Sequence, residues 1–286
     1  MAETVAQSLT SILEQLDDRF EVVVVDDGSD DGSVEILSTL EERYDNLRVE
    51  TEAGNSNHGE ARAHAVELAE GDYILGSLDA DDEFTPCITQ FVSLYHELAE
   101  AKKTDFLLLG YGLYMAPRSL LVEVPYRSLG YGEDRDLYRR LLAEDALLSL
   151  SHHRIRRTLG YRPTKIESLR IGFETMMNQF RSGFYLRSYI RWAFEEIIGK
   201  RDRISPVRGF LHLIVAPFAY LLSLTQERYE APEEFRDIGV YKDALMDVHM
   251  TLSEMEERFG IEVDRSTIGP RGCAVFDIDT KRSLID

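Results

Sequence analysis

Apolar residues in the first hundred positions of the chain follow two different spacings. Mainly apolar runs at 20–25 and 72–75 indicate short strands that are buried on both faces of a sheet. Around them, apolar residues recur every third or fourth position over 3–16, 60–70 and 84–101, which is the spacing of amphipathic helices. This alternation predicts an α/β fold, with a mostly parallel sheet covered by helices on both faces.

The pattern is less regular beyond this first stretch. An apolar segment at 105–121 is broken by glycines and a proline, which predicts one or two strands. We expect a helix to begin near residue 133, another at 242–259, and a strand at 273–278. We therefore divide the chain into an α/β domain at residues 1–150 and a mainly helical region at 151–286.

The charge of the chain restricts its partners. The formal net charge is −20, with only 6 Lys against 26 Arg. Binding to nucleic acid needs a basic face, so we expect no nucleic-acid partner. The excess of acid is typical of a halophile surface. Two distant cysteines, Cys87 and Cys273, and an N-terminus without an apolar leader segment predict a cytoplasmic protein without a signal peptide.

The sign of the charge reverses locally in the second half of the chain. Residues 152–208 hold 13 basic and 5 acidic residues, and a mainly apolar run follows at 209–224. A basic stretch beside an apolar one is typical of segments that bind anionic lipid head groups. We therefore predict peripheral membrane contact through 152–224, at the inner face of the cell membrane. The alternative is a core helix at 209–224 beside a basic patch that contacts the acidic domain.

Carboxylates directly follow the predicted strand at 72–75. Asp79 and Asp81 lie at its carboxyl end, where α/β sheets bind their ligands. Two carboxylates can hold Mg²⁺ or Mn²⁺ and leave coordination positions for substrate phosphates. An acidic surface loop would have the same composition. The choice between a metal site and such a loop therefore depends on the neighbouring motifs.

Four short motifs occur in one order along the chain. They are VVVVDDGSDDGS at 22–33, NHGEAR at 57–62, LDADD at 78–82 and GEDRDLYRRL at 132–141. In this order and spacing, over roughly residues 3–142, the chain resembles the family 2 glycosyltransferases, which have the GT-A fold. The resemblance implies a nucleotide-diphosphate sugar as donor and a divalent metal, Mn²⁺ or Mg²⁺, as cofactor.

The resemblance also implies roles for individual residues. Asp27 would bind the nucleotide base, Asp79 and Asp81 would hold the ribose and the metal, and Arg62 would contact the donor. Asp134 would deprotonate the acceptor hydroxyl. Transfer chemistry independently needs a metal or Arg to stabilise the negative charge that develops on the leaving group, and one general base. One base without a second nucleophile favours direct displacement with inversion.

We therefore expect an inverting, metal-dependent glycosyltransferase that acts on a glycan or lipid-linked acceptor, in the assembly of surface glycans or glycoproteins. One alternative is a catalytically impaired nucleotide-sugar-binding or scaffold protein. A second is a nucleotidyltransferase, although the acidic DDGSDDGS turn is a poor cradle for phosphates.

The resemblance carries one further expectation, about the beginning of the sheet. Members of this family open with an apolar strand that precedes the helix found here at 3–16. We expect that strand to be encoded upstream of Met1, because the sheet would otherwise have unpaired backbone groups beside Val22 and because the downstream motifs are intact in type and order. The alternative is a truncated and inactive relative of the family.

Overall fold

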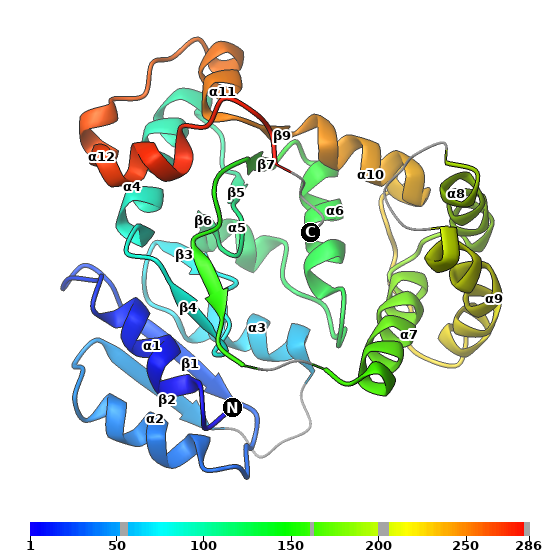
Figure 1. Cartoon of the computed structure of the whole chain (residues 1–286), viewed down its shortest axis with the longest axis horizontal. Coiled ribbons are helices and arrows are strands. Elements are labelled where there is room, and N and C mark those ends of the chain that lie inside the picture. Colours follow the sequence, from blue (N-terminus) through cyan, green and yellow to red (C-terminus); the bar gives the residue numbers. More distant parts are fainter. Residues whose placement is uncertain (52–56, 161–162, 200–205, 283–286) are drawn as a thin grey trace.

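The computed structural model describes residues 1–51, 57–160, 163–199 and 206–282 (Figure 1). Its strands form three hydrogen-bonded groups, and helices surround them. The α/β class and the helical C-terminal region are thus confirmed. The sequence also predicts a loop at 54–59, which lies partly outside the described residues.

The first group is a small parallel pair near the N-terminus. Strand β1 (Val22–Asp26) runs alongside β2 (Leu47–Thr51), and two helices, α1 (Val5–Leu13) and α2 (Ser33–Glu41), pack with them. Leu9, Leu37 and Leu47 are buried in the small core that these elements share. This unit places the acidic turn after β1 next to the rest of the fold.

The second group is a mixed five-stranded sheet at the centre of the molecule. Its strands, in spatial order, are β3 (Tyr73–Gly76), β6 (Tyr114–Pro117), β5 (Leu107–Leu109), β7 (Leu147–Leu150) and β9 (His249–Met250). The β5–β7 and β7–β9 pairs are parallel, whereas β6 runs antiparallel to both of its neighbours. The predicted strands at 105–121 are therefore β5 and β6.

Side chains of this sheet alternate between two cores. Leu108 of β5 belongs to one core with helices α4 (Ile88–Lys102) and α12 (Arg265–Phe276), whereas Leu107 and Leu109 belong to a second core with α3 (His58–Leu68) and α6 (Glu133–Ala143). Because neighbouring side chains of a strand point to opposite faces, helices cover both sides of the sheet.

The third group is an antiparallel pair that connects distant parts of the chain. Strand β4 (Asp82–Phe84) begins at the last residue of the LDADD motif and pairs with β8 (Arg156–Thr158). Residues beyond position 150 thus return to the N-terminal half through β8 and again through β9. The division into domains 1–150 and 151–286 stays a prediction.

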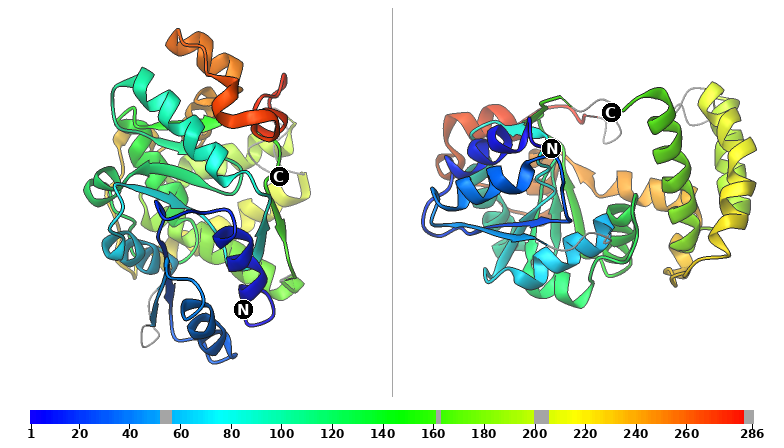
Figure 2. Two further views of the ribbon diagram at one scale, coloured as in Figure 1. Left: turned by 90° about the vertical axis from the view of Figure 1, so that its left-hand side faces the viewer. Right: turned by 90° about the horizontal axis from the view of Figure 1, so that it is seen from below.

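Three helices stand to one side of the sheet and share their own core. They are α7 (Lys165–Arg181), α8 (Leu186–Ile197) and α9 (Pro206–Ser223), and the views of Figure 2 show them beside the α/β part. The remaining helices are α5 (Arg118–Glu123), the 3-10 turn η1 (Glu233–Phe235), α10 (Ile238–Asp247) and α11 (Leu252–Phe259).

Two predictions for the C-terminal part were wrong. The helix expected at 242–259 is interrupted, because Thr251 caps a new helix and β9 precedes it. Most of the strand expected at 273–278 belongs to α12. Gly269 has a positive φ of 63° and Pro270 restarts the helix after it, a position that suits proline.

The strands β1 and β3 are not hydrogen-bonded to each other, and the part of the chain that is described has no strand paired between them. The strand that we expect to be encoded upstream of Met1 stays a prediction.

Candidate functional site

The acidic motif after β3 forms a tight turn between two sheets. Ser77 has a positive φ of 63°, which is uncommon for a residue with a side chain and often marks a functional turn. The backbone amide of Asp82 donates a hydrogen bond to the carbonyl oxygen of Asp79 over 3.1 Å. The turn therefore gathers Asp79, Asp81 and Asp82 at the carboxyl end of β3.

Arg156 on β8 holds two of these carboxylates. Its Nη1 atom lies 3.0 Å from Oδ2 of Asp79 and also contacts Asp82. Asp82 is buried, and Thr158 donates a second hydrogen bond to it over 2.8 Å. Sequence reasoning missed Arg156, and only its place in the basic stretch could have pointed to it. Asp82 thus fixes the turn, whereas Asp79 and Asp81 remain partly exposed.

Arg62 connects the acidic turn to the start of α6. Its guanidinium lies 3.2 Å from the Ser77 hydroxyl, 3.5 Å from Asp79 and 3.3 Å from Glu133. The NHGEAR motif brings it there because Asn57 caps α3 in a capping box with Glu60. Arg62, which we expect to contact the donor, therefore lies beside the acidic motif.

The start of α6 places two adjacent acids in different surroundings. Glu133 is 5% exposed, and burial, aided by the neighbouring charge of Asp134, raises the pKa of its carboxyl to about 7. Asp134 is half-buried and accepts a hydrogen bond from the amide of Arg135 over 2.7 Å. Asp134 is thus the more accessible acid, and Glu133, which the sequence did not single out, is the one beside Arg62.

A buried ionic cluster holds this end of α6 in place. Asp136 accepts contacts from Arg127 at 3.3 Å, Arg139 at 3.1 Å and Arg140 at 3.0 Å. Arg139 also reaches the carbonyl oxygen of Ser182 after α7. The cluster ties Asp134's helix to the helical region.

Asp27 lies exposed at the carboxyl end of β1. It is near enough to act on His58 at the start of α3: burial and the charge of Arg62 lower the pKa of His58, while the charges of Asp79 and Asp27 oppose this shift. The ends of β1 and β3 and the start of α3 therefore meet around His58, another residue that the sequence did not single out.

The two carboxylates predicted to bind metal suit a divalent cation. Burial, followed by the negative charges of Asp82 and Asp79, raises the pKa of Asp81. A cation would relieve this repulsion, and carboxylate oxygens suit Mg²⁺ and Mn²⁺. Within the described ranges, no three potential ligands form a ready cluster. Such a cation would complete its coordination with substrate phosphates and water.

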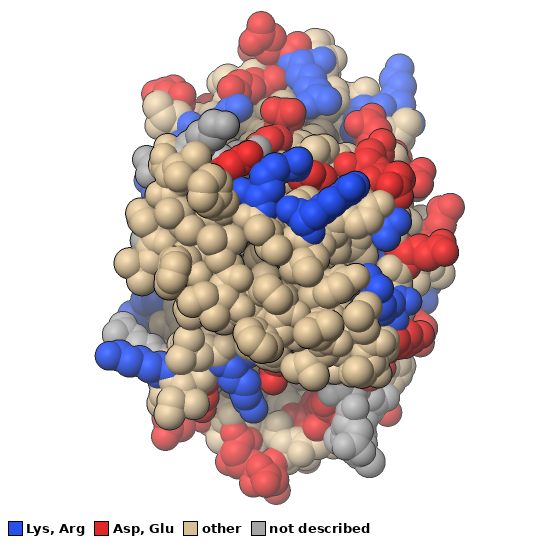
Figure 3. Space-filling model, turned by 90° about the vertical axis from the view of Figure 1, so that its right-hand side faces the viewer, with Lys and Arg blue, Asp and Glu red and all other residues tan. Residues whose placement is uncertain are grey.

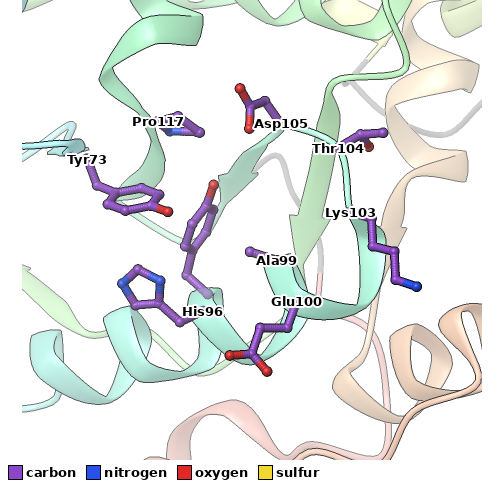
Figure 4. Close-up of a pocket in the computed structure, with 9 residues that line it drawn as sticks. Tyr73, His96, Ala99, Glu100, Lys103, Thr104, Asp105 and Pro117 are labelled. Carbon is purple, nitrogen blue, oxygen red and sulfur yellow. The ribbon is translucent and has the colours of Figure 1, made fainter.

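A cavity of about 340 Å³ lies at the opposite end of β3 (Figure 4). Tyr73, His96 and Lys103 are among its lining residues. It opens at the amino end of the strand, whereas α/β sheets usually bind ligands at the carboxyl end. We therefore assign the site to the acidic turn and not to this cavity.

Comparison with known proteins supports the resemblance in the N-terminal third. Residues 2–101 match the family model described as Glycosyl transferase family 2. The amylovoran biosynthesis glycosyltransferase AmsB of Erwinia amylovora is 30% identical over 137 residues, which cover 46% of this chain and 44% of AmsB. An undecaprenyl-phosphate 4-deoxy-4-formamido-L-arabinose transferase of Pseudomonas syringae is 44% identical over 75 residues, 26% of this chain and 22% of that protein.

The chain spans less than half the length of the curated relatives it matches. Among solved structures, S. aureus TarS 1–349 in complex with UDP superimposes with a TM-score of 0.46 at 17% identity. That match covers 92% of this chain and 89% of the TarS chain.

Proposed function

We propose, from the premise that residues 2–101 form a glycosyltransferase family 2 domain, that the protein transfers a sugar from a nucleotide-diphosphate sugar with inversion. The observation that carries this proposal is the position of Arg62. It lies between the acidic turn at Asp79 and the two acids that open α6. The diphosphate of a donor and the hydroxyl of an acceptor would therefore both lie within reach of the Arg62 guanidinium.

The donor would lie across the carboxyl ends of β1 and β3. Asp27 would accept hydrogen bonds from the base, and Asp79 would bind the ribose. Arg62 and Arg156 already face Asp79 and would offer positive charge to the diphosphate. Charged donors preorganised at a leaving group stabilise the charge that develops on it.

Asp79 and Asp81 would hold a divalent cation, which would supply further positive charge to the leaving diphosphate. Asp81 is the more suitable of the two because its negative charge is the less compensated. The metal requirement is therefore expected to depend first on Asp81.

Asp134 would act as the general base. It would take the proton of the acceptor hydroxyl while that oxygen forms a bond to the anomeric carbon of the sugar. The bond from the same carbon to the diphosphate oxygen breaks, and the nucleoside diphosphate leaves. A single displacement of this kind inverts the anomeric carbon. A lipid phosphate as acceptor would already be ionised and would need Asp134 less.

We infer that the acceptor is a glycan or a lipid-linked intermediate of surface glycan assembly, handled at the cytoplasmic side of the membrane. The similarity to AmsB and to the undecaprenyl-phosphate arabinose transferase supports this inference. The basic and apolar composition of 152–224 supports it as well.

A thermal-shift screen of nucleotide sugars, with and without Mn²⁺, tests the proposal. We expect one nucleotide sugar to raise the melting temperature only when Mn²⁺ is present, and slow hydrolysis of that donor to follow. Stabilisation without any hydrolysis or transfer would favour the catalytically impaired binding protein. No stabilisation by any nucleotide sugar would contradict the proposal.

A further inference from the structure

Helices α8 and α9 carry an apolar surface that no other described part of the chain covers (Figure 3). The large side chains that form it are between 37% and 62% exposed. We call this surface the α8–α9 face and define it by six residues: Ile190, Phe194, Phe210, Ile214, Phe218 and Leu221.

The large and small residues of α9 are arranged in the opposite way to those of an ordinary surface helix. Phe210, Ile214 and Phe218 follow each other at four-residue spacing on the exposed side. The fully buried positions of the packed side are small residues such as Gly209 and Ala216. Leu213 and Tyr220 pack there partly buried. A Cβ atom on Gly209 would lie 3.0 Å from the carbonyl oxygen of Ala193 on α8. A helix that needs only its own protein normally buries its large apolar side chains.

Charge on this face differs from charge elsewhere in the chain. Helix α9 has no acidic residue and one cation, Arg208, although the chain as a whole has a formal net charge of −20. On α8, the exposed Arg187 precedes Ile190 and Phe194 at helical spacing. Figure 3 shows both basic and acidic side chains around the broad uncharged area. Arg187 of α8 and Arg208 of α9, together with the apolar side chains between them, suit an anionic lipid surface.

We propose that the α8–α9 face docks on the anionic surface of a lipid bilayer, with α9 lying in the plane of the head groups. Within the described ranges, α9 is the one helix long and apolar enough to cross a membrane, and 22% of it is buried. It packs along α7 and α8, however, and its 18 residues rise about 27 Å, slightly less than the hydrocarbon core of a bilayer. An interfacial position keeps this packing and still buries the exposed aromatic rings.

A bilayer fits this face better than a second copy of the chain. A symmetric dimer would bring the same patch of both copies together, where α9 offers no acid and α8 only the half-buried Glu195 and the buried Glu196 to face the arginines of the partner. Anionic head groups supply that opposite charge.

Docking would also set the distance between the membrane and the candidate site. Helix α7 packs against α9 and contacts the loop that leads to Asp134. The side chain of Asn178 donates a hydrogen bond to the carbonyl oxygen of Tyr131 over 3.2 Å, and Arg181 donates one to that of Ser128 over 3.1 Å. This proposal does not depend on sugar transfer, because the face would bind lipid whatever the site does.

Vesicle flotation with the full chain tests the proposal. We expect the chain to float with vesicles of phosphatidylglycerol and phosphatidylcholine, and much less with phosphatidylcholine alone. The double variant Phe210→Ser/Phe218→Ser should lose at least tenfold in bound fraction. Val122→Ser is the matched control, because Val122 is 52% exposed on α5 and not on this face. The double variant Arg187→Glu/Arg208→Glu should bind less and lose the dependence on salt.

Circular dichroism and the melting temperature show whether each variant is folded, and exposed positions should tolerate these changes. Absence of flotation by the full chain, or equal flotation by the folded Phe210→Ser/Phe218→Ser variant, would overturn the proposal. A dimer in light scattering that this variant breaks, without vesicle binding, would assign the face to a second copy and overturn it too. Donor binding in the thermal-shift screen should be the same in all variants, so failure here is distinguishable from failure of the proposed function.

Discussion

The guanidinium of Arg156 lies 3.0 Å from the carboxylate of Asp79, although 77 residues separate them in the chain. The same guanidinium contacts Asp82, whose carboxylate is almost fully buried. Through these two contacts, strand β8 holds the acidic turn and supplies a positive charge where the diphosphate of a donor would lie. Arg157, the next residue, pairs with Glu83 at the surface instead.

Replacement of Arg156 by Met should therefore destabilise the fold. It leaves the buried Asp82 without its cation, and removal of one partner of a buried pair costs about 3–5 kcal/mol. Arg157→Met is the matched control: its pair with Glu83 is exposed and should contribute less than about 1 kcal/mol. Urea unfolding measures both changes. Equal stability of the two variants would show that Arg156 does not hold the turn.

Replacement of Asp81 by Ala should abolish the effect of Mn²⁺ on donor binding. Asp81 is the acid of the turn whose charge is least compensated, and a site built on two carboxylates cannot spare one. Isothermal titration with the nucleotide sugar, with and without Mn²⁺, measures this. Asp72→Ala, at the exposed amino end of the same strand, should bind donor normally. Unchanged affinity of the Asp81 variant in Mn²⁺ would remove Asp81 from the metal site.

Replacement of Asp134 by Asn should lower sugar transfer to a hydroxyl acceptor by roughly 10²-fold or more, which is the usual contribution of a general base. Donor binding should be unchanged, because the acid turn and Arg62 stay in place. Single-turnover transfer and the thermal shift by donor separate the two effects. Arg135→Gln, an exposed neighbour, should transfer normally. A small loss of transfer with a large loss of stability would make Asp134 only a helix-capping acid.

Much of the α/β part could be predicted from the sequence because its signals are local. The strands β1 and β3, the helices around them and the acids that follow each strand lie within short segments of regular spacing. The NHGEAR motif likewise marks the start of α3, where Asn57 caps the helix that carries Arg62. The predicted roles of Asp27, Asp79, Asp81 and Asp134 remain predictions about chemistry.

Other features depend on contacts between distant segments. Arg156 reaches the acidic turn only because β8 pairs with β4, and the spacing of residues does not predict that these two strands pair. The strand predicted at 273–278 was wrong because a short apolar run suits either a strand or a helix. The break at Gly269 and Pro270 separates this run from the helical turn before it. The small residues of α9 that pack against the neighbouring helices determine which of its sides is exposed. The hydropathy of α9 alone is compatible with either a core helix or a membrane helix.

Glu133 should make the stability of the protein depend on pH. Burial raises its pKa from 4.5 to about 7 in the folded chain. Between these values the folded state binds more protons than the unfolded state, so the contribution of Glu133 to stability is present below pH 4.5 and falls as the pH rises to 7. A shift of this size corresponds to about 3 kcal/mol. Glu133→Gln stays neutral and should not lose stability in this window.

The measurement is the difference in unfolding free energy between Glu133→Gln and the original chain, at pH 5 and at pH 8. The difference cancels the titration of all other groups that the substitution leaves unchanged. We expect the Gln variant to gain relative stability on going to pH 8, because a buried charge next to Asp134 is removed. Glu67→Gln on the exposed side of α3 should show the same difference at both pH values. A constant difference for Glu133→Gln as well would mean that Arg62, 3.3 Å away, compensates the charge of Glu133 fully and that its carboxyl is ionised at both pH values.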